Sequence, residues 1–106
     1  MTLSVSKDGF ELPLENVKVI GVDEIRTHKP VPENSIYNVY YELSIVPTND
    51  WIKIFEKNKS SNKKLENSWI DGRHIVVKCQ INEIDQILEE LRKEVTRTNF
   101  ENAKNS

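Results

Sequence analysis

The 106-residue chain has few of the residues that build catalytic, metal or phosphate sites. It contains one cysteine, two histidines and three glycines. One cysteine excludes an internal disulfide, and the scattered His28, His74 and Cys79 match no zinc-ligand spacing. Three separated glycines cannot form a phosphate-binding loop, and no serine lies in a nucleophile elbow. The sequence therefore predicts no catalytic residue, no metal ligand and no cofactor.

Long apolar runs and a strong charge of one sign are also missing. No apolar run approaches the roughly 20 residues that a membrane-spanning helix needs. The N-terminus has neither the basic nor the apolar region of a signal peptide, so we expect a cytoplasmic protein with no membrane contact. Lysine and arginine number 15 against 17 acidic residues, a formal charge of −2. This balance argues against nucleic acid as a partner, because non-specific binding needs a clustered positive surface.

The strongest local pattern runs from Glu66 to Cys79. Asp71-Gly72 separates two apolar runs and favours a two-residue hairpin turn, in which both central residues have positive φ. Such a turn would pair Trp69 with His74. Side chains alternate between the faces of a strand, so the two strands divide into two sets. The set expected to face the core is Ile70, Ile75, Val77 and Cys79, and the set on the opposite face is Trp69, His74, Val76 and Lys78.

Four further segments complete the expected fold. A strand is predicted from Val17 to about Arg26, with Val17 and Val19 on one face, Ile20 and Val22 on the other, and a bulge at Gly21. A second strand from Ile36 to Val46 has apolar residues at all its odd positions. Apolar stripes at helical spacing predict helices over about 50–58 and 83–98.

The order of these elements predicts an α+β fold. Two strands, a helix, two strands and a helix form the ββαββα order of a circularly permuted ferredoxin-like sandwich, with an antiparallel four-stranded sheet and two helices on one face. We expect one domain over residues 16–98. Residues 1–15, with apolar Phe10, Leu12 and Leu14, are expected to form an arm or short hairpin, and residues 99–106 a flexible tail.

The sheet face opposite the helices is the candidate binding surface. In this fold it carries aromatic and neighbouring side chains that would contact a partner, namely Tyr40, Trp69, His74, Val76 and Lys78. The main hypothesis is a small non-enzymatic binding protein of the immunity or accessory kind. Its aromatic face would serve self-association into a homodimer or contact with a protein partner.

Two alternatives from other classes stay open. The first is a small enzyme or metabolite-binding domain with its site near the proline-containing loop 28–35, and it predicts that His28 responds to ligand. The second is single-stranded nucleic acid stacked on Tyr40, Trp69 and His74, and it predicts salt-sensitive quenching of tryptophan fluorescence by oligonucleotides.

Overall fold

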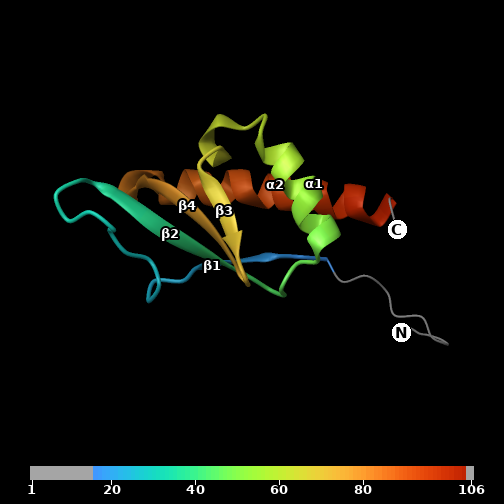
Figure 1. Cartoon of the computed structure of the whole chain (residues 1–106), viewed down its shortest axis with the longest axis horizontal. Helices are drawn as coiled ribbons and strands as arrows, with labels where there is room; N and C mark the ends of the chain where they lie inside the picture. The colour runs from blue at the N-terminus through green and yellow to red at the C-terminus, as the bar shows by residue number, and fades with distance from the viewer. Residues whose placement is uncertain (1–15, 105–106) are drawn as a thin grey trace.

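The computed structural model describes residues 16–104. The predicted arm or hairpin over residues 1–15 lies outside these residues. The elements follow the predicted ββαββα order, which confirms the α+β class. In chain order they are β1 (Val19–Val22), β2 (Ile36–Leu43), α1 (Asn49–Lys59), β3 (Ser68–Asp71), β4 (His74–Gln80) and α2 (Ile84–Lys104) (Figure 1).

The four strands form one antiparallel sheet in the order β1-β2-β4-β3. α2 runs along the length of the molecule, and α1 crosses it (Figure 1). Both helices pack on the same face of the sheet, because apolar residues of α1 and α2 share one core cluster with the odd-numbered residues of β2 and β4. The largest fully buried side chains of this core are Trp51, Tyr41, Phe55, Leu43 and Leu65.

The β3–β4 hairpin has its turn one residue later than predicted. Its two turn residues are Gly72 and Arg73, and Asp71 pairs with His74. Gly72 has φ of 62°, a left-handed conformation that glycine adopts at little cost. Moving the turn by one residue shifts the pairing by two, so Trp69 pairs with Val76 and every side chain keeps its predicted face.

The predicted bulge at Gly21 is present, and it changes which side chains of β1 face the core. Val19 pairs with Leu43 and Gly21 with Glu42, so one extra residue lies between them. Val22 therefore packs against the core on the same side as Val19, whereas Ile20 is 56% exposed. The expectation that Ile20 and Val22 share a face was wrong, because the bulge shifts the alternation by one residue.

α2 continues to Lys104, where the sequence predicts a flexible tail from residue 99. Asn99 explains the difference, because its side chain contacts α1 and the segment just before β1. Its Oδ1 accepts hydrogen bonds from the Val17 N–H (3.1 Å) and from the indole N–H of Trp51 (2.8 Å), and its Nδ2 donates to the Val17 carbonyl (2.8 Å). The domain therefore includes the last turns of α2.

Candidate functional site

Three of the predicted surface residues form a row across the open face of the sheet. Val76 on β4 pairs with Tyr40 on β2 and with Trp69 on β3. Although Val76 faces away from the helices, it is fully buried, whereas Tyr40 is half-buried and Trp69 is 37% exposed. Cross-strand neighbours on one face contact each other, so the two aromatic side chains cover the valine from both sides.

Two histidine rings flank Tyr40. The ring of His74 lies at 5.6 Å in an edge-on arrangement, and the ring of His28 lies at 6.1 Å. His28 reaches this place because its backbone exchanges two hydrogen bonds with Asn38 of β2. The hydroxyl of Thr27 also accepts a hydrogen bond from the Tyr40 N–H. Nothing in the sequence placed His28 on this face.

Asp23, at the end of β1, contacts His74. Its Oδ2 lies 3.0 Å from the His74 Nε2 and 3.8 Å from the Arg26 Nε. Burial acts to raise the pKa of Asp23, but the hydrogen bonds from His74 and from backbone N–H groups outweigh it, so this pKa lies below its ordinary value. No sequence pattern assigned a role to Asp23. The contact could be found only once the bulge and the strand register were known.

A polar hollow of about 470 Å³ lies beside this pair. Arg73 also lines it and makes an ion pair of 3.1 Å with Glu42. The lining thus mixes both signs of charge, and it contains no serine, threonine or cysteine that the His74–Asp23 pair could activate. The hollow therefore offers no arrangement for nucleophilic catalysis.

Cys79 lies on the other side of the sheet from His74. It is 3% exposed within the core. Burial raises the pKa of its thiol to about 11, with a further contribution from the charge of Glu83. The thiol therefore stays protonated near neutral pH and cannot pair with His74. Within residues 16–104, no group of three or more His, Cys, Asp or Glu side chains could hold a metal ion.

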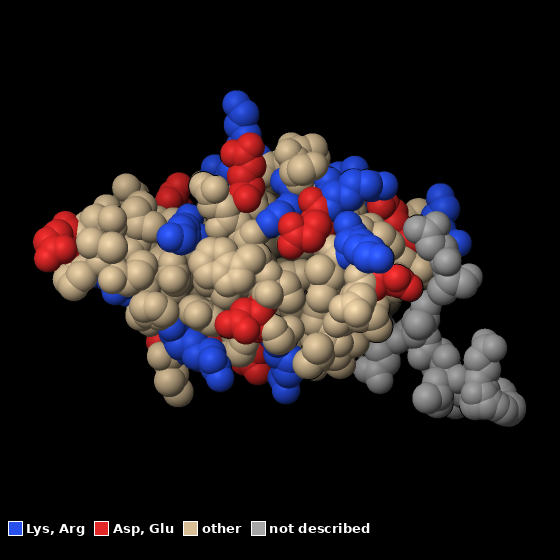
Figure 2. All heavy atoms as spheres, viewed as in Figure 1, with Lys and Arg blue, Asp and Glu red and all other residues tan. Residues whose placement is uncertain are grey.

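Lys78 extends the open face towards a small basic hollow. The hollow has a volume of about 230 Å³. Its basic and polar lining residues are Lys63, Lys64, Asn67 and Lys78, and its acidic lining residue is Glu83. Figure 2 shows lysine, arginine, aspartate and glutamate side chains interspersed over the face in view, without a large area of one sign. On this face, the distribution does not resemble the continuous positive surface that nucleic-acid backbones require.

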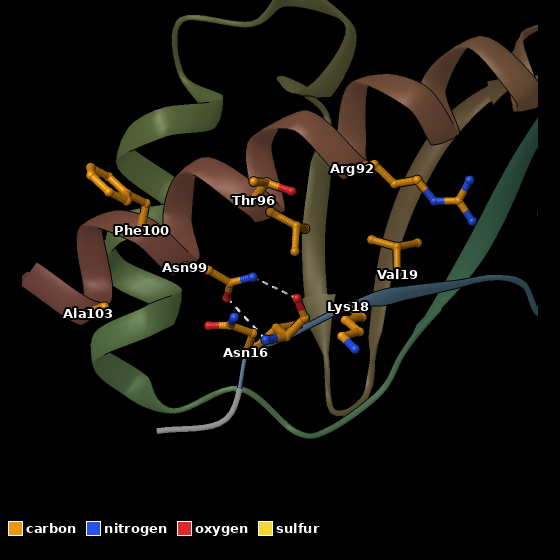
Figure 3. A pocket seen from close by; sticks show the side chains of 10 residues that line it. Asn16, Lys18, Val19, Arg92, Thr96, Asn99, Phe100 and Ala103 are labelled. Carbon is orange, nitrogen blue, oxygen red and sulfur yellow. Dashed lines mark hydrogen bonds between the residues drawn. The ribbon is translucent and has the colours of Figure 1, made fainter. Parts of the chain in front are cut away.

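A second candidate surface lies between β1 and the C-terminal half of α2. The hollow there has a volume of about 590 Å³. Figure 3 shows Asn99 at its side, hydrogen-bonded to the backbone of Val17 just before β1, with Phe100 and Arg92 projecting from α2. Phe100 is 67% exposed. No residue of this groove belongs to the predicted aromatic surface.

No protein-family model, curated protein or solved structure matches this chain. No helix among the described residues combines the length and apolar character needed to span a membrane.

Proposed function

We propose that this chain is a small, cytoplasmic, non-enzymatic binding protein that self-associates into a dimer through its open sheet face. The single observation that carries the proposal is the row formed by Tyr40, Val76 and Trp69. Aromatic side chains over a buried aliphatic centre resemble the apolar core of a protein interface, where tyrosine and tryptophan are enriched. Polar side chains, among them His28, His74 and Lys78, surround this row as an interface rim would.

The charges around the row favour a second copy of the chain as the partner. Asp71 and Lys78 lie on opposite sides of the Trp69–Val76 pair, because the two strands are antiparallel. Both are exposed, and neither makes an ion pair within residues 16–104. In a dimer with the two open faces in contact, the two-fold axis would run between the sheets, perpendicular to the strands and level with the Trp69–Val76 pair. This axis would bring Trp69 against its copy and Lys78 near Asp71 of the other copy. The face is therefore self-complementary, as a symmetric interface requires.

The first test is the solution mass across a range of concentrations, by size exclusion with light scattering. We expect the parent chain to be a dimer and Trp69→Ala to be a folded monomer with an unchanged far-UV circular dichroism spectrum. Ile25→Ala is the matched control, since Ile25 is 96% exposed and lies outside the aromatic row. That control should remain dimeric. A parent chain that is monomeric at all concentrations would exclude self-association, and the face would then be tested against a different protein.

The charge arrangement gives a second and sharper test. Lys78→Asp and Asp71→Lys should each weaken the dimer, because each places like charges opposite one another. The double variant should restore it, because the pair is reversed and not removed. If the double variant associates no better than the single variants, the proposed two-fold arrangement is wrong.

A further inference from the structure

The small basic hollow beside the open sheet face is lined by three lysines from two separate parts of the chain. Lys63 and Lys64 belong to the 3-10 helix η1 (Lys63–Leu65), which follows α1, and Lys78 lies on β4. All three are exposed, and within residues 16–104 none of their ammonium groups forms an ion pair or a hydrogen bond. Because like charges gathered around one hollow repel one another, an anion placed between them is stabilised.

The turn that carries the two η1 lysines is fixed to the rest of the fold. The side chain of Asn62 accepts a hydrogen bond from the Lys64 N–H (3.0 Å) and donates one to Glu90 of α2 (3.0 Å). Leu65 is fully buried, and its carbonyl accepts a hydrogen bond from the hydroxyl of Ser68. The backbone of η1 is therefore already in place, so a ligand in the hollow would have to order little besides the lysine side chains themselves.

The acidic lining residue of the hollow does not neutralise the three lysines. Glu83 Oε1 accepts a hydrogen bond from the Gln80 N–H (2.8 Å), and Glu83 forms no ion pair with any residue of the described range. Lys59, which precedes the same turn, behaves differently, because its Nζ pairs with Glu56 (3.0 Å) and donates to the Ser68 carbonyl. The fold thus provides partners for Lys59 and leaves the lysines of the hollow without them.

The size and the donors of the hollow define a class of ligand. Its volume of about 230 Å³ lies below the roughly 300–1,000 Å³ of pockets for drug-sized ligands, so it suits a small ligand. Asn67 adds a side-chain amide that can donate a hydrogen bond beside the ammonium groups. Lysine is a common ligand of phosphate, and a phosphate group offers more charge and more acceptor oxygens than a carboxylate. A phosphate group can therefore engage all three lysines.

We propose that this hollow binds a small phosphate-bearing anion, whose oxygens contact Lys63, Lys64 and Lys78. Positive charge confined to one hollow, on a chain with a formal charge of −2, favours a small anion over a nucleic-acid strand, which needs an extended positive groove. Lys78 also belongs to the proposed dimer interface, so the test changes the other two lysines. The inference does not depend on the proposed dimer.

Titration of the full chain with pyrophosphate, at an ionic strength held constant with sodium chloride, tests the site. We expect saturable changes in the amide NMR signals of Lys64, Asn67 and Lys78. The double variant Lys63→Gln with Lys64→Gln should bind pyrophosphate at least about tenfold more weakly, because it removes two of the three charges. Both lysines are exposed, so this variant should keep the far-UV circular dichroism spectrum of the parent.

The matched control makes the same change in net charge elsewhere on the chain. Lys53→Gln with Lys57→Gln alters two exposed lysines of α1 that do not line the hollow. This variant should bind pyrophosphate within about twofold of the parent, because solvent and salt screen charges outside the site. An equal loss of affinity in the two double variants would overturn the proposal, since binding would then follow net charge alone. Signals that do not saturate at millimolar pyrophosphate would overturn it as well.

Two further ligands separate the sources of the phosphate group. Adenosine triphosphate supports the site if it binds as tightly as pyrophosphate or more tightly, and tighter binding would identify a nucleotide as the source. A single-stranded oligonucleotide that binds more than about tenfold more tightly than pyrophosphate would overturn the proposal in favour of a nucleic-acid surface. All titrations are repeated on the Trp69→Ala background, which removes association through the sheet face. Failure of the proposed dimer would therefore leave the result for the hollow unchanged.

Discussion

The carboxylate of Asp23 lies 3.0 Å from the imidazole of His74, across 51 residues of sequence. The two residues lie at the end of β1 and on β4, and β2 separates these strands in the sheet. Their side chains therefore meet over the open face of β2, next to Tyr40. This contact fixes the segment after β1 beside the aromatic row and positions one of the two histidine rings that flank Tyr40.

The first prediction concerns the pH dependence of this contact. The pKa of Asp23 is lower in the folded protein than in the unfolded chain. The contact therefore stabilises the fold fully above the ordinary pKa of about 4, and the stabilisation is lost as the pH falls through the lowered value. Asp23→Asn should be less stable than the parent at about pH 7, and the difference should shrink towards zero in strong acid.

Urea unfolding at several pH values measures this difference. The control is Glu24→Gln, because Glu24 is the exposed neighbour of Asp23 and makes no ion pair with any residue of the described range. A constant difference between parent and Asp23→Asn at all pH values would show that the carboxylate charge is not what stabilises the contact.

The second prediction concerns Asn99. Asn99→Ala leaves the backbone groups of Val17 and the indole N–H of Trp51 without their partner, which should lower the free energy of unfolding by about 2–3 kcal/mol. Asn99→Asp keeps the acceptor but loses the donor to the Val17 carbonyl, so it should also destabilise the fold. Thr96 lies on the same helix and is exposed, so Thr96→Ala should change the free energy of unfolding little. If the two alanine variants unfold at the same urea concentration, Asn99 does not stabilise the end of α2.

The third prediction isolates the backbone cost at the hairpin turn. An added Cβ at position 72 would contact nothing within 4 Å, so substitution there tests conformation without a steric clash. Gly72→Ala should cost about 1–2 kcal/mol, the penalty of the left-handed region for an ordinary residue. Gly72→Asn should cost less, since asparagine tolerates this conformation. Thermal or urea unfolding of the three chains would give the order Gly, Asn, Ala, and any other order would contradict this assignment.

The fourth prediction concerns the single thiol. With a pKa of about 11, on the order of one Cys79 thiol in a thousand is ionised at about pH 8, and the side chain is also buried. A disulfide reagent should therefore label the folded protein very slowly, with a rate that follows local or global opening. Labelling should become fast and complete in urea. Rapid labelling without denaturant would mean that the core around Cys79 opens readily.

The face assignments could be predicted from the sequence because they depend on side-chain parity. The turn was placed one residue early, yet Trp69 and Val76 kept their faces, since an error of one residue in the turn shifts the pairing by an even number. Tyr40 was placed on the same face by the alternation of β2. Alternation is a property of each strand alone and needs no knowledge of the tertiary structure.

Contacts that depend on several elements together could not be predicted. Whether Val22 faces the core depends on the bulge in β1. The position of His28, which lies outside the named strands, depends on its backbone pairing with Asn38 of β2. The end of α2 depends on hydrogen bonds from Asn99 to Val17, just before β1, and to Trp51 of α1. Asparagine has a modest helix propensity, so the local sequence around Asn99 favours an earlier end that tertiary hydrogen bonds override.

The hydrogen bonds between Val17 and Asn99 also set an order of events during synthesis. These residues are 82 positions apart, so the backbone groups of Val17 emerge from the ribosome long before Asn99 can pair with them. Until Asn99 has also emerged, the nascent chain carries two unpaired backbone groups just before the edge strand β1, and unpaired backbone at a sheet edge favours aggregation. Chains cut short before residue 99 should therefore be more prone to aggregation than their small loss of core would suggest.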